Sequence, residues 1–146
     1  MSLTPTDVAP GDRRMSAHIR PLLLALRPAL TEADFDDFAA EAHAQGLTFT
    51  AAYDTDGHCA AVATHRVLAT SRGRILFVDD LVTDPARRSS GIGATLLAHL
   101  TKRARAADCR RIELDSGTTN FAAHRFYHAH RMNISALHFA LDVEDG

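Results

Sequence analysis

The sequence predicts an α/β protein in which a mixed sheet carries helices on both faces. Two segments with helical spacing come first, an antiparallel meander follows, and the second half alternates strand, helix, strand, helix and strand. With 146 residues, 46% hydrophobic and 23% charged, the chain has the size and composition of one globular domain. We therefore expect a single domain over residues 1–146.

The first elements are expected to be a flexible leader and two helices. Residues 1–15 are polar near the start, contain two prolines and lack the apolar segment of a signal peptide. Apolar residues then recur at helical spacing over 16–26. Thr31, with an acidic residue three places later, predicts the cap of a second helix that ends at Gly46.

The remaining segments alternate between strand and helix patterns. A turn of the type Asp-Thr-Asp-Gly joins the first two strands as a hairpin. The expected strands cover 47–53, 58–69, 75–83, 110–116 and 134–143, and the expected helices cover 92–107 and 120–130. In the last strand Leu137, Phe139, Leu141 and Val143 share one face, which favours pairing across a homodimer.

The stretch from Asp79 to Gly93 is the most informative part of the chain. It predicts a buried strand, a turn with Pro85 and a glycine-containing loop that opens directly into a helix. A helix start exposes unpaired N–H groups and the positive end of the dipole, and glycines let a phosphate approach the backbone closely. A dinucleotide-binding fingerprint would need glycine or alanine where Leu96 stands, and a Walker loop is absent from the sequence. The stretch therefore predicts a pyrophosphate cradle of another kind.

Two motifs resemble those of one superfamily, the GNAT N-acetyltransferases. They are Arg88-x-x-Gly91-x-Gly93 and, after one helix and one strand, Asn120-x-x-Ala123-x-x-Phe126-Tyr127. The resemblance covers roughly residues 47–143. It implies the GNAT fold, with a mixed, mostly antiparallel sheet of six to seven strands and helices on both faces. It also implies an acyltransferase that moves the acetyl group of acetyl-CoA, its co-substrate, to a primary amine of a small molecule or protein by direct attack.

The resemblance assigns roles to the residues of both motifs. Strand backbone would pair with the pantetheine arm, amides of the loop would hold the pyrophosphate, and Arg87 and Arg88 would contact phosphate. Tyr127 would stand beside the CoA sulfur as the general acid. The cofactor-binding residues expected are Leu81, Val82, Thr83, Arg87, Arg88, Ser89, Ser90, Gly91, Ile92, Gly93, Ala94, Asn120, His124 and Tyr127.

Removing the proton from the acceptor ammonium is more demanding than stabilising the leaving thiolate. An ammonium with a pKa of ~10.4 costs about 4–5 kcal/mol to deprotonate at pH 7, whereas a thiol titrates near 8.5. The base expected is Asp79, Asp80 or Asp115. Asp79 and Asp80 are adjacent, so we expect them to point to opposite faces of one strand. Each carboxylate has a structural alternative, which is an ion pair with a nearby arginine.

Composition argues against several other classes of protein. The net charge of −2 gives no footprint for nucleic acid, and no apolar run is long enough to span a membrane. The two cysteines, at separate strands, are typical of reduced thiols in a cytoplasmic protein. His124 and His128 have a metal-ligand spacing, but the general-base glutamate of a zinc-hydrolase helix is absent, so no metal is expected. The competing function is a non-catalytic acyl-CoA-binding regulatory module, which would not need Tyr127 or the acidic strand ends. The acceptor amine is not identified by the sequence.

Overall fold

The computed structural model describes residues 2–87 and 91–144, and the chain separates into two compact units, Met1–Leu114 and Asp115–Gly146. The first unit contains β1 (Thr4–Val8), η1 (Met15–Ile19), α1 (Arg20–Leu26), α2 (Glu32–Ala44), β2 (Thr48–Tyr53), β3 (Cys59–Thr70), β4 (Gly73–Thr83), η2 (Pro85–Arg87), α3 (Ile92–Ala106) and β5 (Arg111–Leu114). The second unit contains α4 (Phe121–Ala129). Element boundaries lie close to the predicted ones, except at the two ends of the chain.

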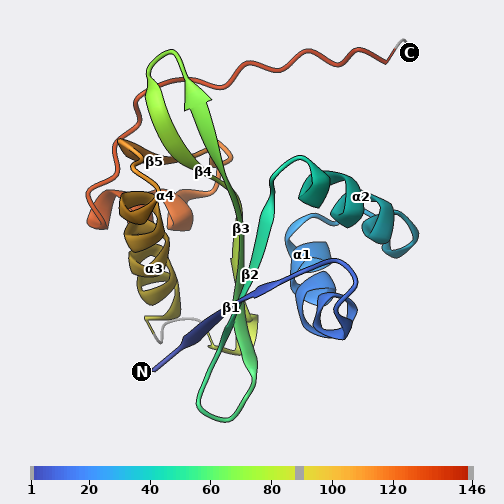
Figure 1. Ribbon diagram of the computed structural model, residues 1–146. Coiled ribbons are helices and arrows are strands. Elements are labelled where there is room, and N and C mark those ends of the chain that lie inside the picture. The colour runs from blue at the N-terminus through green and yellow to red at the C-terminus, as the bar shows by residue number, and fades with distance from the viewer. Residues whose placement is uncertain (1, 88–90, 145–146) are drawn as a thin grey trace. The chain divides into compact units, whose positions relative to one another are not determined.

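The sheet of the first unit has five strands in the order β1-β2-β3-β4-β5. β1 to β4 pair antiparallel, and β5 joins β4 in parallel (Figure 1). The parallel step requires a crossover, which α3 provides. The α/β class with a mixed sheet is confirmed, but the expectation of six to seven strands is wrong for the described residues.

Helices cover both faces of this sheet, as the sequence predicted. α1 and α2 lie on one face and α3 lies on the other (Figure 1). On the first face Ile19, Leu23 and Phe35 are fully buried against Phe49 of β2. On the other face Leu96 and Leu100 of α3 are buried against Leu76 of β4 and the alanines of β3. The small alanine side chains let the helix pack closely on the strand.

Local sequence signals explain the helix ends of the first layer. The Thr31 hydroxyl accepts the Asp34 N–H at 3.2 Å, which caps α2, and Gly46 follows the helix with φ of +96°. Pro21, which has no N–H to donate, stands just after the π-helical turn Met15–Ile19, where the backbone bonds are already shifted.

Residues 1–15 do not form the flexible leader that we expected. Thr4–Val8 pairs with β2 as an edge strand, and Val8 and Met15 are buried in the core. Pro5 is tolerated because an edge strand leaves one side of its backbone unpaired. The Asp7 carboxylate fixes this strand to α3, since Arg103 Nη1 donates to both of its oxygens at 2.8 and 2.9 Å. This long-range ion pair has no signal in the local sequence.

In the second unit, α4 is formed as predicted, but the final strand is not. The Asn120 side chain accepts the Ala123 N–H at 3.3 Å and so caps α4. Residues 134–143 adopt no regular secondary structure, and their large apolar side chains are exposed. The prediction of a strand is therefore wrong for the single chain. The residues alternate as they do in a strand, but a strand also needs a neighbouring strand to pair with.

The end of α4 offers a test of backbone strain. Arg131 has a φ of +68°, and the next N–H bonds back to the Tyr127 carbonyl at 2.9 Å, so this residue takes the place usually held by glycine. We expect Arg131→Gly to raise the free energy of unfolding by about 0.5–1 kcal/mol, measured by urea denaturation. Arg131→Ala is the control, because it removes the side chain but keeps the strain. A loss of stability in the glycine variant equal to that in the alanine variant would contradict this reading.

Candidate functional site

The sheet opens at β4 on the side of β5. β5 pairs with β4 from Ile75 to Val78, while β3 stays paired with β4 as far as Thr83. In the described part of the first unit, the β5-facing edge of β4 therefore has no strand partner from Asp79 to Thr83. This edge includes Leu81, Val82 and Thr83, whose backbone groups were predicted to pair with an extended ligand. An unpaired edge of this kind accepts an added chain.

The start of α3 follows this edge along the chain. Gly91 has a φ of +74°, and a Cβ built on it would meet no atom within 4 Å. Among the described residues no side chain caps the helix, which leaves the first-turn N–H groups of Ile92, Gly93 and Ala94 for a ligand, as the cradle requires. The predicted loop residues Arg88, Ser89 and Ser90 lie outside the described residues.

Arg87 is engaged by carboxylates of the first unit. Its Nη1 contacts Asp54 of the β2–β3 turn at 2.5 Å, and its Nε lies 3.9 Å from Asp84. The sequence predicted that the Arg87 guanidinium contacts a phosphate. In the structure it connects the hairpin turn to the turn after β4. The side chain is partly exposed, so the ion pair leaves one face of the guanidinium open to solvent.

The two adjacent aspartates of β4 line the same cavity, contrary to our expectation. The pairing register moves from Thr64 opposite Asp80 to His65 opposite Val78, so Asp79 is an extra residue in the strand. Such a bulge breaks the alternation of side chains between the two faces. The prediction of opposite faces assumed a regular strand, and the bulge removes that assumption.

This cavity, of about 350 Å³, combines acidic groups with an apolar wall. It lies between β4 and the helices α1 and α2, and its lining residues are Leu23, Arg27, Leu30, Phe38, Asp79 and Asp80. An apolar pocket with a few convergent charged groups is typical of a small-ligand site. Each of the two carboxylates is paired with an arginine, Asp80 with Arg27 and Asp79 with Arg66, so a cationic ligand would bind here by replacing an arginine.

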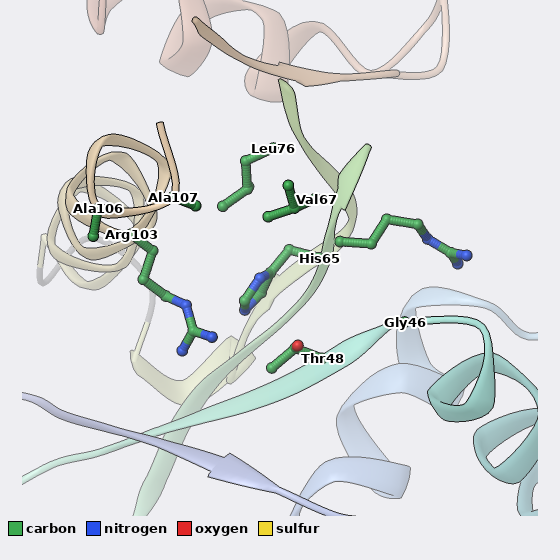
Figure 2. Close-up of a pocket in the computed structure, with 9 residues that line it drawn as sticks. Gly46, Thr48, His65, Val67, Leu76, Arg103, Ala106 and Ala107 are labelled. Carbon is green, nitrogen blue, oxygen red and sulfur yellow. The ribbon is translucent and has the colours of Figure 1, made fainter. Parts of the chain in front are cut away.

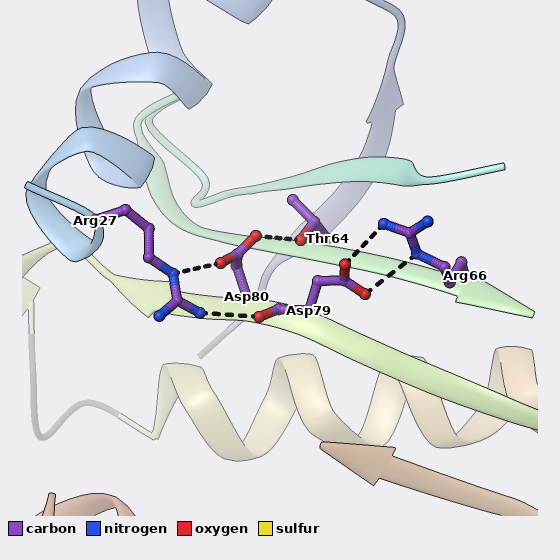
Figure 3. A network of polar contacts seen from close by, with 5 residues as sticks. All are labelled: Arg27, Thr64, Arg66, Asp79 and Asp80. Atoms are coloured by element: carbon purple, nitrogen blue, oxygen red, sulfur yellow. Dashed lines mark hydrogen bonds and ion pairs between the residues drawn. The ribbon is translucent and has the colours of Figure 1, made fainter. Parts of the chain in front are cut away.

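Both carboxylates are held in place by arginine (Figure 3). Arg27 Nε donates to one oxygen of Asp80 at 2.9 Å, and the Thr64 hydroxyl donates to the other at 2.6 Å. Arg66 Nη2 donates to Asp79 at 2.8 Å. The Asp80 side chain is 10% exposed and that of Arg27 is 55% exposed. Asp80 is thus the fixed member of its pair, and Arg27 is the member that solvent or a ligand can replace.

The other predicted site residues lie in the second unit. Tyr127 on α4 is half-buried, and burial raises its pKa above the ordinary value of 10.0. Asn120 caps α4, His124 Nε2 contacts the Gly117 carbonyl at 2.7 Å, and Asp115 contacts His138 at 2.9 Å. The side chains of Asn120, His124 and Asp115 therefore each have a structural contact within their own unit. Among the described residues, no cluster of metal-ligating side chains was found.

Sequence reasoning missed Arg27, Thr64 and Arg66 as part of the site. Arg27 and Thr64 reach Asp80 from α1 and β3, and Arg66 reaches Asp79 from β3. The only available signal was the general one that buried carboxylates need partners.

A larger cavity, of about 500 Å³, lies where α3 ends rather than where it begins. Figure 2 shows His65 and Arg103 pointing into it, with Thr48 and Leu76 beside them. The Thr50 hydroxyl donates to Asp7 at 2.9 Å and lies 2.8 Å from His65 Nε2. Since the hydroxyl proton is already donated, His65 donates from Nε2. This arrangement ties β1, β2 and β3 together at the far end of α3 from the glycine loop.

Residues 15–131 match the family described as acetyltransferase (GNAT). The structure of AAC(6')-Iy in complex with a bisubstrate analog, CoA-S-monomethyl-acetylneamine, is similar with a TM-score of 0.80 and 16% identity, over 99% of this chain and 100% of that chain. A ribosomal-protein-alanine N-acetyltransferase from Brucella melitensis biovar Abortus 2308 is similar with a TM-score of 0.79 and 16% identity, over 98% and 100%.

A third solved structure is an acetyltransferase from Trypanosoma brucei, with a TM-score of 0.75 and 21% identity over 97% of this chain and 100% of that chain. At these identities the solved structures show the fold alone. No curated protein matches the chain. No helix within the described ranges is long and apolar enough to cross a bilayer.

His65 makes stability depend on pH in a defined window. Burial, and to a smaller degree the charge of Arg103, lower the pKa of His65 from 6.5 to about 4. Above pH 6.5 the imidazole is neutral in both states. Between 6.5 and 4 the unfolded chain binds a proton that the folded chain does not, so stability falls as the pH falls. Below 4 both states are protonated and this loss stops, at about 3 kcal/mol in all.

We expect His65→Gln to flatten the fall in unfolding free energy between pH 7 and 4.5, measured by urea denaturation. His43→Gln, at an exposed position on α2, is the control and should keep the slope. Equal slopes in the His65 variant and the original protein would contradict the role of His65.

Proposed function

Because this chain belongs to the GNAT acetyltransferase family, we propose that it transfers the acetyl group of acetyl-CoA to a primary amine of a small molecule or protein by direct attack. Family membership makes the chain an acyltransferase that uses an acyl-CoA, as the sequence predicted. One observation carries the proposal. The edge of β4 that lacks a described strand partner is followed along the chain by the start of α3, whose N–H groups no described side chain caps. β4 also lines the cavity that contains Asp79 and Asp80.

Acetyl-CoA fits the first two of these features. The pantetheine arm would pair with the backbone from Leu81 to Thr83 as an added strand, because these groups have no strand partner on that side. The pyrophosphate would sit on the N–H groups of Ile92, Gly93 and Ala94. Arg88, Ser89 and Ser90 would complete the cradle, and Asn120 and His124 would contact the arm or the phosphates. When bound, acetyl-CoA supplies the activated acyl group.

The reaction makes one C–N bond, breaks one C–S bond and moves three protons. The bound ammonium first gives one proton to the base, and the neutral amine then attacks the thioester carbon, so that the C–N bond forms and the C–S bond breaks to release the CoA thiolate. The nitrogen loses its second proton to solvent as the amide forms, and the thiolate takes one proton from the acid. Supplying the neutral amine costs about 4–5 kcal/mol at pH 7, so the base carries the greater share of catalysis.

We assign the base to Asp80 and the binding of the acceptor to the whole cavity. The incoming ammonium would replace the exposed guanidinium of Arg27 at the Asp80 carboxylate, a contact that costs little to break because Arg27 is largely in water. Thr64 would keep holding the other oxygen. Asp79 adds negative charge beside it, and Leu30 and Phe38 offer an apolar wall to the rest of the acceptor.

Tyr127 is proposed as the acid for the leaving thiolate. Its hydroxyl is protonated at neutral pH and so holds a proton to donate, although burial, which raises its pKa, makes it a weaker acid. Asp115 is the alternative base. Its contact with His138 is exposed on both sides, so it remains able to accept a proton.

The narrower expectations about partners and location also stay proposals. We propose no nucleic-acid or membrane partner, a cytoplasmic location and a homodimer. The acceptor panel should include an aminoglycoside and a peptide with N-terminal alanine, because the names of two structural neighbours contain acetylneamine and ribosomal-protein-alanine.

Binding of the co-substrate can be tested by thermal unfolding. Acetyl-CoA at ~100 times its dissociation constant should add about 2.7 kcal/mol of stability. That corresponds to roughly 5–10 °C in melting temperature for a chain of this length. Gly91→Val should reduce the shift, because valine does not readily adopt φ of +74° and its Cβ would enter the cradle.

The control for this experiment is Gly46→Val. Gly46 also has a positive φ and open space around a Cβ, but it follows α2 and is not part of the loop. It should lower the melting temperature and keep the ligand-induced shift. The absence of any shift at saturating acetyl-CoA in the original protein would overturn the proposed cofactor.

The catalytic roles can be tested by release of free CoA thiol with a panel of primary amines. We expect Asp80→Asn to lower kcat by about 100-fold and Tyr127→Phe by about 10- to 100-fold, at or below the lower end of the usual range of about 10²–10⁴-fold for acid–base groups. Asp56→Asn, at an exposed position in the β2–β3 turn, is the control and should leave kcat unchanged. Loss of turnover in Asp115→Asn with retention in Asp80→Asn would move the base to Asp115.

A further inference from the structure

The segment Ile134–Val143 carries apolar side chains that the single chain leaves in water. Exposed fractions are 73% for Ile134, 75% for Leu137, 89% for Phe139, 87% for Leu141 and 88% for Val143. Contiguous apolar surface of this kind on a folded protein marks an interaction site. Single exposed apolar residues would need no explanation, but here they alternate with small or polar residues for seven positions.

This alternation has a second property, which is that it is self-complementary about Ala140. If two copies of the segment run antiparallel with Ala140 opposite Ala140, Phe139 faces Leu141 and Leu137 faces Val143. On the other face His138 stands opposite Asp142. From Leu137 to Val143 every large apolar side chain then meets an apolar one, and each imidazole meets a carboxylate. Opposed pairs of these kinds stabilise a sheet, whereas like charges directly opposite destabilise it.

We infer that Leu137–Val143 is an intersubunit strand, which pairs antiparallel with the same segment of a second copy around a two-fold axis at Ala140. The interface is isologous, as in most dimers, because each residue pair occurs twice. The backbone groups of the segment gain the partners that the described single chain does not give them.

The surface involved is large enough for a dimer. A side chain of this size carries roughly 100 Å² of apolar surface, so the eight large side chains from Leu137 to Val143 in two copies offer roughly 800 Å². The surface that they cover and the paired backbone add to this value. Stable interfaces bury about 1,200–2,000 Å² in total.

One contact of the single chain competes with this pairing. His138 Nδ1 lies 2.9 Å from Asp115, with the His138 side chain 67% exposed and the Asp115 side chain 54% exposed. Exposed ion pairs contribute little to stability. His138 can therefore leave Asp115 and contact Asp142 of the second copy at little cost in free energy.

A cysteine placed on the axis tests the register. In this pairing Ala140 of one copy lies about 4.5–5.5 Å from Ala140 of the other between Cα atoms, within disulfide range. Two residues at position 136 would be eight strand positions apart, about 27 Å. We expect Ala140→Cys to form a disulfide-linked dimer of the full chain under mild oxidation, and Ala136→Cys to remain unlinked.

Both positions are exposed, so both variants should fold. The original protein, with Cys59 and Cys109, is the blank and should stay unlinked under the same conditions. Equal linkage at positions 136 and 140, or linkage at neither, would overturn the inference. Neither outcome depends on acetyl transfer, so this test is separate from that of the proposed function.

A charge exchange tests the same pairing without a cross-link. His138→Asp places Asp opposite Asp142, and Asp142→Lys places Lys opposite His138. We expect each single variant to raise the dimer dissociation constant about three- to tenfold, measured by sedimentation, and the double variant to restore it. If the dissociation constant of the double variant rises by the product of the two single effects, or if the protein is monomeric at all concentrations, the pairing is refuted.

Discussion

The divergence of β4 from β5 after Val78 is the feature on which the rest of the proposed site depends. Up to that residue the two strands are hydrogen-bonded, and beyond it the described part of the first unit gives β4 its β3 partner alone. A strand that is paired on one side alone is rigid enough to hold a ligand and still has backbone groups to offer it. The bulge at Asp79 stands at this same point, so the change in pairing and the change in side-chain direction occur together.

Charge is the second constraint, and it acts through pairs rather than single groups. Asp80, Asp79, Asp54 and Asp7 each contact an arginine that is distant in sequence or on another element. Each of these pairs fixes the position of its carboxylate. The pairs of Asp80 and Asp54 have nearly buried carboxylates, and in the first of them the cation, Arg27, is the more exposed, at 55% against 30% for Arg87. That asymmetry makes the site suited to exchange one cation for another.

At both ends of the chain the sequence pattern predicts the wrong secondary structure. Thr4–Val8, with a proline in a short polar stretch, forms an edge strand because β2 offers a complete backbone edge. Ile134–Val143, with a regular alternation, remains without a strand partner in the single chain. Periodicity and composition describe one segment at a time, whereas a strand forms only when two segments pair.

The sequence by itself determined most of the helices and strands between the two ends of the chain. Thr31 and Gly46 bounded a helix and Asp54 to Gly57 marked a hairpin, since these are short-range effects of backbone geometry and capping. Gly91 and Gly93 at the start of α3 predicted a phosphate-binding helix start, which stays a prediction. The two motifs also identified the family, which is confirmed. Only the tertiary structure decided that Asp79 and Asp80 share one cavity and that Arg27 and Arg66 hold them. A bulge arises from pairing with another strand, and ion pairs between residues 53 positions apart depend on the packing of whole elements.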